Sequence, residues 1–533
     1  MGSKFLYLVA VALVVGGLNG GVDVRVNQDN MHILQNEPSI TINPGLQNNI
    51  VVAYNEAPGC GYGLGISYSG DGGVTWNDNQ IGPIWGIEGD PSADADLSGN
   101  VFVGFMSYRP NFFTDTNGIY VAVSGDGGMT WPTITAVDLH TNSPQSPGHF
   151  TDKPYLCVDN YPSSPFKDYV YIAWQRDNPN GVNADVYFAA SYNAGTTFTT
   201  PQKISDLPSN VGQCVGQVPK AAPNGDVFVT WADYGLQGHC RAYLYIDKSS
   251  DSGATWGTDV LIDSFIAVPR YPNFPNTSFY VRSYPTIGVS PMNSNDVYVA
   301  IAADPDGVNG PDDGDIYLWA SHDGGQTWNG PVRVNDDNTY NDQFQPWLDV
   351  KPNGIIDIVW IDRRNDPNDW NFEVYFAYST DGGASFSANV PISDMPYAPP
   401  PSPNSWLGEY IGIDVDNTYA YIVWTDTRLQ ERDIYFDTME NPPTGTEEGT
   451  LDRELKLGFN GKCLYVVSDA DVMREALIRI FDVSGRAVLD RRIEVSPGET
   501  FSLDLTHSLH TGVYFAELKW GGGREHLKFM FLR

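Results

Sequence analysis

A loop between residues 304 and 315 gathers oxygen-bearing side chains that could bind a cation. Asp304, Asp306, Asn309, Asp312, Asp313 and Asp315 all fall within it. Hard cations such as Ca²⁺ take roughly six to eight oxygen ligands, and carboxylates this close together repel one another unless a cation neutralises them. The loop therefore predicts a calcium site, with a solvated acidic loop as the alternative. We expect no other cofactor.

The five cysteines cannot all pair within one chain. Cys157 sits in an apolar strand pattern and Cys463 lies in the last domain, which leaves Cys60, Cys214 and Cys240 in loops. Cys214 lies in the loop that enters the fourth unit, and Cys240 lies at the end of that unit's loop between the second and third strands, both on one face. We expect a disulfide between these two, which requires Cα atoms within about 7 Å of each other.

Several kinds of chemistry find no support in the sequence. The histidines show neither metal-site spacing nor that of a catalytic triad. No glycine-rich phosphate loop lies between a strand and a helix. The formal net charge of −35 repels nucleic acid and anionic membranes. We therefore expect no nucleic-acid partner.

One eight-residue pattern, Ser-x-Asp-x-Gly-x-Thr-aromatic, organises the chain. Its first copy runs from Ser69 to Trp76, and Asn193 and Ser385 are the substitutions in the third and sixth copies. A polar side chain can bind the amides of a tight turn, glycine accepts positive φ, and an aromatic ring covers the sheet behind it. The third positions of the six copies are Asp71, Asp126, Asn193, Asp251, Asp323 and Asp381.

Each copy closes a unit of four short strands, which is the size of a propeller blade. The units open at Glu37, Asp90, Lys153, Val218, Tyr284, Gln345 and Glu409. Seven openings predict an all-β, seven-bladed propeller, with six blades as the alternative. The seventh unit lacks a fourth strand, and residues 22–27 echo residues 331–335, the fourth strand of the fifth unit. We therefore expect the N-terminal strand to complete the last blade, which removes an exposed sheet edge.

The repeated turn resembles the Asp-box, or bacterial neuraminidase repeat, of sialidase-like β-propellers, and the resemblance covers residues 21–442. In that family the box is structural. The family's fold places the blade openings and the loops between second and third strands on the face opposite the boxes, where we expect ligands to bind.

The resemblance also implies a test for sialidase activity. Those enzymes hold the substrate carboxylate with three arginines and use a tyrosine nucleophile helped by glutamate, with an aspartate as acid and base. The first arginine is replaced here by Asn36. The catalytic candidates are Tyr410, Glu37 and Asp90, and the ligand-binding candidates are Arg176, Arg282, Arg363, Arg364, Arg428 and Glu409.

Two functions remain open. One is a glycan-cleaving enzyme of exo-sialidase type, and the other, which we favour, is a non-catalytic surface propeller that binds a glycan or protein. A purely structural role is the alternative for several of these residues. Asp233, Asp362 and Asp426 could be repeated turn caps, and Arg363 and Arg364 could pair with flanking aspartates. A cluster of three arginines near one Tyr–Glu pair would favour the enzyme.

The two ends of the chain indicate export. Lys4 and the apolar residues 5–18 have the layout of a signal peptide, which we assign to residues 1–20. Residues 443–455 read as a linker. Residues 456–533 predict a small β-sandwich that resembles the C-terminal sorting domain of type IX secretion cargo through Phe481–Arg486 and Thr511–Tyr514; an ordinary accessory β-domain is the alternative. We expect a secreted or outer-membrane-surface protein without a transmembrane segment, monomeric, whose partners include the type IX secretion machinery.

Overall fold

The computed structural model describes residues 23–531 with gaps. The residues outside the description within this range are 29–33, 58–62, 112–114, 144–147, 180–182, 208–211, 236–240, 270–280, 308–310, 401–406, 430, 441–454, 460–461, 469–473, 483–486, 497–499, 507, 511 and 521–522. The predicted signal peptide and most of the predicted linker therefore lie outside it.

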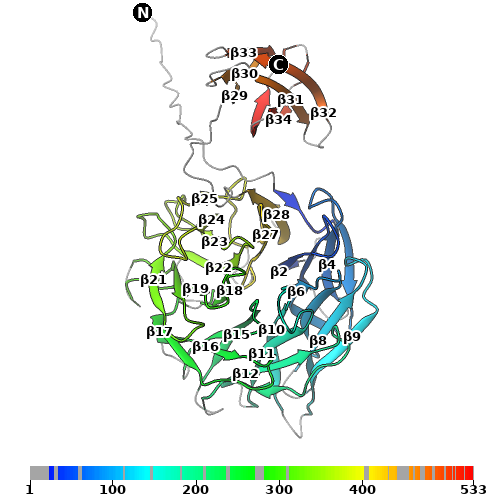
Figure 1. The fold of residues 1–533 in the computed structure, drawn as a ribbon, viewed down its shortest axis with the longest axis vertical. Coiled ribbons are helices and arrows are strands. Elements are labelled where there is room, and N and C mark those ends of the chain that lie inside the picture. Colours follow the sequence, from blue (N-terminus) through cyan, green and yellow to red (C-terminus); the bar gives the residue numbers. More distant parts are fainter. Residues whose placement is uncertain are drawn as a thin grey trace, which may run out of the picture. The chain divides into compact units, whose positions relative to one another are not determined.

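The chain is all-β and divides into two compact units, residues 1–444 and residues 445–533. Among the described residues, no helix has the length and hydropathy to cross a bilayer. The first unit consists of seven four-stranded antiparallel sheets, which Figure 1 shows arranged radially around a central axis as the blades of a propeller.

The blades follow one another along the chain, each running from an inner to an outer strand. Blades 1 to 3 are β2 (Leu34–Ile42), β3 (Ile50–Ala57), β4 (Leu64–Ser69) and β5 (Asn77–Ile81); β6 (Ile87–Ala95), β7 (Val101–Tyr108), β8 (Thr116–Ser124) and β9 (Thr133–Thr141); and β10 (Phe150–Val158), β11 (Val170–Asp177), β12 (Ala184–Ser191) and β13 (Gln202–Lys203). Blades 4 to 6 are β14 (Cys214–Ala221), β15 (Val227–Asp233), β16 (Arg241–Ser249) and β17 (Val260–Ile266); β18 (Thr286–Val289), β19 (Val297–Ala303), β20 (Asp315–Ser321) and β21 (Asn329–Arg333); and β22 (Gln343–Val350), β23 (Ile356–Asp362), β24 (Glu373–Ser379) and β25 (Val390–Pro391).

The seventh sheet is closed by the N-terminal strand. It contains β26 (Gly412–Val415), β27 (Tyr419–Asp426), β28 (Asp433–Glu440) and, outermost, β1 (Val24–Arg25). Val24 pairs with Phe436 and Arg25 with Tyr435, as the sequence echo predicted. Residues from the two ends of the first unit thus share one sheet.

The second strand of each blade is buried on both faces, which explains its continuous apolar sequence. Trp174, Trp231, Trp360 and Trp424 near the ends of such strands are fully buried. They pack between neighbouring blades, so the core of the ring is a series of inter-blade clusters.

The six repeated turns have nearly the same hydrogen bonds. In the first, the Ser69 hydroxyl donates to Asp71 Oδ1 at 2.8 Å, and the amide and hydroxyl of Thr75 donate to the two oxygens of Asp71 at 2.8 and 2.6 Å. Asn193 takes the place of Asp in the third turn and bonds both groups of Thr197. The Thr327 hydroxyl and amide lower the pKa of Asp323 to about 2. These carboxylates are therefore committed to holding the turns.

The inner strand of most blades carries a bulge at its start. Glu37, Asp90, Lys153 and Gln345 have φ angles of 54°, 52°, 50° and 53°, at or next to a break in the strand register. In blade 4 the register break encloses Gly216 and Gln217, two residues before the predicted opening at Val218. A bulge re-aims side chains, and here it turns four of them towards the axis of the ring.

The second unit is a small sandwich of two sheets. One contains β29 (Leu455–Phe459), β30 (Cys463–Ser468) and β33 (Thr500–Asp504), and the other β31 (Arg474–Asp482), β32 (Ala487–Val495), β34 (Gly512–Trp520) and β35 (Gly523–Phe531). Leu464 and Leu503 from the first sheet share one core with Ile478 and Leu518 from the second.

Candidate functional site

The predicted opening residues meet in a buried cluster around Lys153, which we name the axial lysine cluster (Glu37, Asp90, Lys153, Arg282, Glu409). Lys153 Nζ lies 2.8 Å from Glu37 Oε1, 3.1 Å from Asp90 Oδ1 and 2.9 Å from Glu409 Oε2. Arg282 Nε lies 3.2 Å from Glu409 Oε1, and the Tyr284 hydroxyl donates to Glu409 Oε2. The residues that open blades 1, 2, 3 and 7 thus meet in one place.

Opposite charges set the protonation of this cluster. Burial disfavours the ammonium of Lys153, but the three carboxylates outweigh burial and raise its pKa well above the ordinary value. Burial would raise the pKa of Asp90 and Glu409, yet Lys153, joined by Arg282 at Glu409, lowers both. Burial, together with Asp90 and Glu409, raises the pKa of Glu37 well above its ordinary value despite Lys153. The cluster thus pairs Lys153 with the carboxylates of Asp90 and Glu409, and Glu37 is the member that burial favours in its protonated form.

The three catalytic candidates are buried and already bonded. Tyr410 is 3% exposed and its hydroxyl donates to the carbonyl of Pro91 at 3.0 Å, while Glu37 and Asp90 are 0% and 2% exposed. Burial also raises the pKa of Tyr410 well above its ordinary value, so the phenol stays protonated. A nucleophile and its acid must reach the substrate, and this arrangement argues against those roles.

The five candidate arginines are paired with carboxylates in different blades. Arg176 binds Asp138, and Arg363 binds Asp342 and Asp369. Arg364 and Arg428 each donate to the aspartate two residues earlier, Asp362 and Asp426. Only Arg282 of the five joins the axial lysine cluster. The three-arginine cluster of the sialidase test therefore does not assemble from these five side chains.

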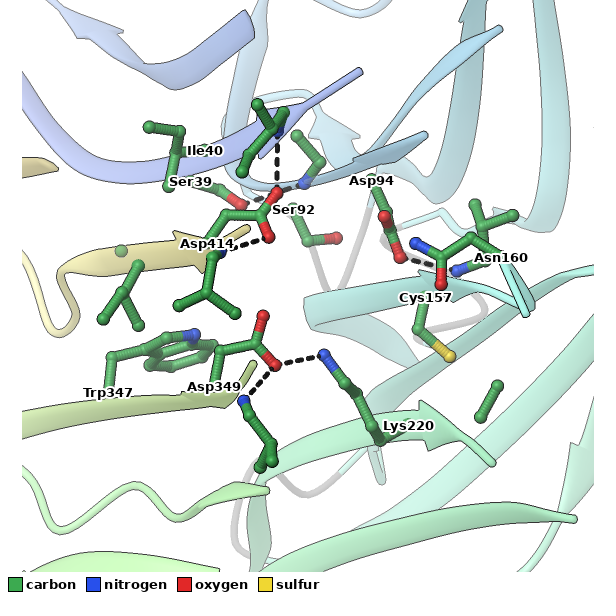
Figure 2. Close-up of a pocket in the computed structure, with 18 of the residues that line it drawn as sticks. Ser39, Ile40, Ser92, Asp94, Cys157, Asn160, Lys220, Trp347, Asp349 and Asp414 are labelled. Carbon is green, nitrogen blue, oxygen red and sulfur yellow. Dashed lines mark hydrogen bonds and ion pairs between the residues drawn. The ribbon is translucent and has the colours of Figure 1, made fainter. Parts of the chain in front are cut away.

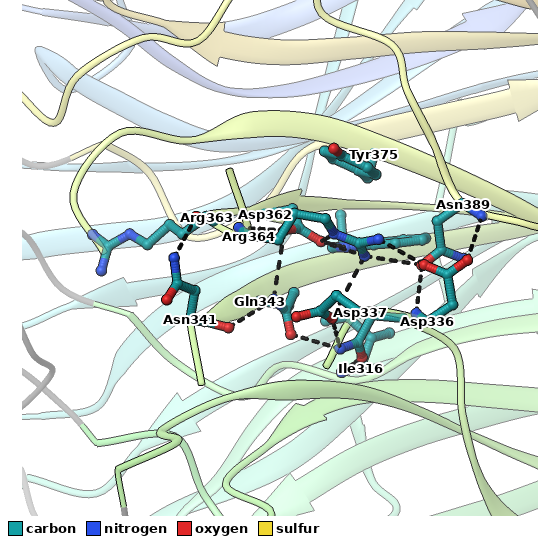
Figure 3. Close-up of polar contacts among 12 residues, drawn as sticks. Ile316, Asp336, Asp337, Asn341, Gln343, Asp362, Arg363, Arg364, Tyr375 and Asn389 are labelled. Carbon is teal, nitrogen blue, oxygen red and sulfur yellow. Dashed lines mark hydrogen bonds and ion pairs between the residues drawn. The ribbon is translucent and has the colours of Figure 1, made fainter. Parts of the chain in front are cut away.

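The aspartates after the buried tryptophans cap turns. Asp362 Oδ1 accepts the amide of Arg364, and its Oδ2 accepts the indole of Trp360. Asp426 makes the same bonds to Arg428 and Trp424, and Asp233 accepts the amide of Gly235. Figure 3 shows Arg364 lying over Tyr375 and held by Asp362 and Asp336. These aspartates therefore have the turn-cap role, and Arg364 the ion pair with a flanking aspartate, that the sequence analysis gave as alternatives to ligand binding.

The calcium and disulfide predictions are only partly covered by the structure. Asn309 lies outside the described residues, and within the described part of the chain no group of three His, Cys, Asp or Glu side chains could hold a metal ion. Cys214 is the first residue of β14 and not part of a loop as predicted, and it is a buried free thiol. Cys240 lies outside the described residues. Neither prediction gains support.

A cavity of about 640 Å³ opens on the axis at the other end of the inner strands. Its lining follows these strands from Pro38 down to the first turns, such as Asn43 and Asn417. The amide of Gly72 in the first repeated turn donates to the carbonyl of Asn48 in the first turn of the same blade. The cavity therefore lies at the end of the ring that carries the repeated turns, whereas we predicted binding at the opposite face.

Three aromatic rings separate the cavity from the axial lysine cluster. Tyr155, Trp347 and Tyr410 all line the cavity, with ring centroids 5.3 to 5.9 Å apart. Lys153 lies 5.5 Å from the centroid of the Tyr410 ring, on the cluster side. The rings form the apolar floor of the cavity, which we name the aromatic floor.

Charged side chains from four blades surround the space above the aromatic floor. Figure 2 shows Asp94, Lys220, Asp349 and Asp414 projecting around one open region. Lys220 Nζ lies 2.8 Å from Asp349 Oδ1. Asp94 Oδ2 accepts the amide of Val158, and Asp414 Oδ2 accepts the amide of Ile42, each from the next blade around the ring. These two carboxyl groups therefore accept hydrogen bonds from backbone amides at the free edges of the neighbouring inner strands, and they also face the cavity.

The carboxylates of the cavity differ in protonation. Burial raises the pKa of Asp94 to about 6 and that of Asp414 to about 8. Asp349 instead has Lys220 as an ionic partner. At neutral pH Asp414 is therefore mostly protonated and Asp94 mostly ionised, and the Lys220 ammonium lies beside Asp349.

The spacing of the four charged cavity residues along the inner strands was a signal in the sequence for this site. Asp94, Asp349 and Asp414 each lie four residues after an inward-facing position at the start of an inner strand: Asp90, Gln345 and Tyr410. Lys220 has the same spacing from Gly216. A charged residue recurring at one position of an otherwise apolar strand indicates a common lined space.

One family model matches the chain. Residues 462–531 match the secretion system C-terminal sorting domain. No curated protein matches the sequence.

Solved structures match the chain at low sequence identity and with TM-scores below 0.5. A protein of unknown function from Dyadobacter fermentans is 14% identical, with a TM-score of 0.43 over 80% of this chain and 100% of that one. The Hadza microbial sialidase Hz136 is 13% identical, with a TM-score of 0.44 over 74% of each chain. An ulvan lyase of polysaccharide lyase family 25 is 10% identical, with a TM-score of 0.45 over 78% of this chain and 96% of that one.

Proposed function

We propose that this chain is an exported propeller that binds a glycan in its axial cavity. Export rests on the C-terminal sorting domain, which directs type IX secretion cargo to the cell surface or beyond. The observation that supports a glycan ligand is that one cavity combines the aromatic floor with the charged side chains of Asp94, Lys220, Asp349 and Asp414.

A saccharide fits this combination because it has two kinds of surface. Its C–H face packs on aromatic rings, and its hydroxyls bond to carboxylates and ammonium groups. The volume lies within the roughly 300–1,000 Å³ typical of small-molecule sites. Sialidase turnover is not part of the proposal, because the arginines that it would need are engaged elsewhere.

The protonation pattern favours a second candidate, acid–base cleavage of a glycosidic bond. Such cleavage needs one protonated and one ionised carboxyl group on either side of the bond. The raised pKa of Asp414 suits it to the acid role, and Asp349 or Asp94 could act as the base.

The binding proposal is tested with the mature full-length chain on a glycan array, followed by calorimetric titration of the best ligand. Trp347→Ala should weaken binding about tenfold or more, because stacking on the aromatic floor is lost. Trp370→Ala is the matched control, since Trp370 is 40% exposed in a loop at the opposite end of the blades. Equal binding by both variants would contradict the proposal.

Cleavage is tested on the same ligand by mass spectrometry of the products. Turnover by the wild-type protein that disappears in Asp414→Asn would establish the second candidate. An intact ligand after prolonged incubation would leave binding as the function. A fluorogenic sialoside should remain uncleaved in either case.

A further inference from the structure

The cavity carries more negative than positive side chains. Its described lining residues include four aspartates, Asp94, Asp349, Asp414 and Asp416, and one cation, Lys220. Lys220 is bound to Asp349 and attracts Asp94 and Asp414 from a longer distance, so the hydrogen bonds to these two carboxyl groups come from backbone amides. Because charged groups in a partly enclosed space need compensation, protons or a cation must balance these two carboxylates.

The described lining residues do not form a metal site. No group of three His, Cys, Asp or Glu side chains in the described part of the chain could hold a metal ion. A cation brought by the ligand is the remaining way to replace the protons. The aromatic floor of the same cavity is a second feature that points to a ligand, because Trp347 and Tyr410 offer it an apolar surface beside these carboxylates.

We propose that the ligand of the axial cavity is a sugar that carries a free, positively charged amino group. This inference rests on the proposed function and adds the chemical class of the glycan. The sugar ring packs on the aromatic floor, and its ammonium lies between Asp94 and Asp414. An ammonium donates charge-assisted hydrogen bonds that an acetamide or a hydroxyl cannot match. Acidic sugars such as uronates are disfavoured by the same carboxylates.

Binding of such a ligand should release protons. Burial holds the pKa of Asp414 at about 8 and that of Asp94 at about 6, so part of this pair is protonated at neutral pH. A neighbouring ammonium stabilises the ionised forms and lowers both pKa values. Affinity for an amino sugar should therefore rise from pH 6 towards pH 8, as long as the ligand's amine stays charged.

The test titrates the full-length protein with a glucosamine oligosaccharide and with its N-acetylated counterpart, which differ only in the charged group. We expect the free amine form to bind about tenfold tighter or more, as for a hydrogen bond to a charged group. Titration in two buffers of different ionisation enthalpy should show proton release for the free amine form alone. A uronic-acid oligosaccharide and a simple alkylamine should both bind more weakly, the first because of repulsion and the second because it cannot cover the aromatic floor.

Variants assign the effect to the carboxylates. Asp414→Asn and Asp94→Asn should each reduce the ratio of affinities for the free amine and N-acetylated forms. Asp226→Asn, which removes a carboxylate 3.5 Å from Lys248 outside the cavity lining, is the control and should leave the preference intact. Proton release is measured on the wild-type protein. It therefore tests the inference even if a variant fails to fold.

The possible failures are distinguishable. Equal or tighter binding of the N-acetylated or uronic-acid form would overturn this inference while leaving the proposed glycan function in place. Alkylamine binding as tight as that of the amino sugar would overturn the sugar part. Absence of binding by every saccharide would overturn both proposals.

Discussion

Lys153 is the residue that holds the centre of the ring together. Its ammonium neutralises carboxylates contributed by blades 1, 2 and 7, and its side chain is 5% exposed. A buried ion pair is not strongly stabilising in itself, but removal of one partner leaves uncompensated charge behind.

We expect Lys153→Met to lower the free energy of unfolding by about 3–5 kcal/mol, because the buried carboxylates of Asp90 and Glu409 lose the cation that keeps them ionised. Urea denaturation of the full-length chain followed by tryptophan fluorescence measures the change. Lys248→Met is the control: its side chain is 36% exposed beside Asp226, and an exposed pair is worth about 0–1 kcal/mol. Comparable stabilities for the two variants would show that the cluster is balanced by protons instead.

Asp414 should make stability depend on pH. Its pKa is about 8 in the folded chain, because of burial and neighbouring Asp349, and close to 4 when unfolded. The folded state therefore binds this proton more tightly, so the stabilisation is complete below about pH 4 and is lost as pH rises towards about 8. Asp414→Asn cannot ionise, and its stability should decline less than that of the wild type between about pH 5 and 8. Melting temperatures across this range, with Asp226→Asn as control, measure the difference; parallel curves would rule out a raised pKa.

At the residue scale, sequence reasoning succeeded where a role is local. The turn caps at Asp362 and Asp426 involve residues two positions away, so spacing alone indicates them. It failed for Tyr410, Arg176 and Arg282, because their partners come from other blades. Pairing of Arg176 with Asp138, or of Lys153 with Glu409, depends on how the sheets pack and leaves no local signature.

The inner strands are the elements that build both axial sites. Each has a free edge facing the axis, and side chains from the preceding blade cap amides along it: Ser39 binds Ala93, and Ser92 binds Leu156. The same strand presents its bulge to the axial lysine cluster and its far end to the cavity. Blade number and strand order could be predicted from the repeat. The sequence did not predict at which end of the axis the cavity lies. That depends on how the large side chains of Tyr155, Trp347 and Tyr410 fill the axis between the cavity and the axial lysine cluster.

The repeated turns should tolerate a change of charge better than loss of the side chain. Asp71→Ala removes the acceptor for Ser69 and for both groups of Thr75, and we expect a loss of about 1–2 kcal/mol. Asp71→Asn keeps the carbonyl oxygen and can donate to the threonine hydroxyl, as Asn193 does in the third turn, so it should lose less than half as much. Thermal unfolding of both variants gives the comparison. A larger loss for Asn than for Ala would show that the charge itself holds the turn.

At the scale of the whole molecule, closure of the ring joins residues about four hundred positions apart in sequence. The amide of Val26 donates to the carbonyl of Ile434, and the amide of Ile434 donates to Asn27 Oδ1, both at 2.8 Å. Asn27 Nδ2 also binds Asp433 at 2.9 Å, and Asp23 binds Arg428. This contact was predictable because a missing strand and a spare copy of its sequence are both visible in the chain.

Asn27 therefore provides a test of closure that leaves the fold of each blade unchanged. Its side chain is 1% exposed, and Asn27→Ala would leave the buried amide of Ile434 and the carboxylate of Asp433 without these partners. Each unsatisfied buried group costs about 1–3 kcal/mol, so we expect a loss of about 2–4 kcal/mol. Gln28→Ala is the adjacent control, since Gln28 is exposed and an exposed change typically costs less than about 0.5 kcal/mol.

Deletion of residues 22–27 should go further and expose the edge of β28, which a strand can then pair with. A synthetic peptide of residues 22–28 added to the deletion variant should restore its melting temperature, and failure of the peptide to raise it would show that closure depends on more than this strand.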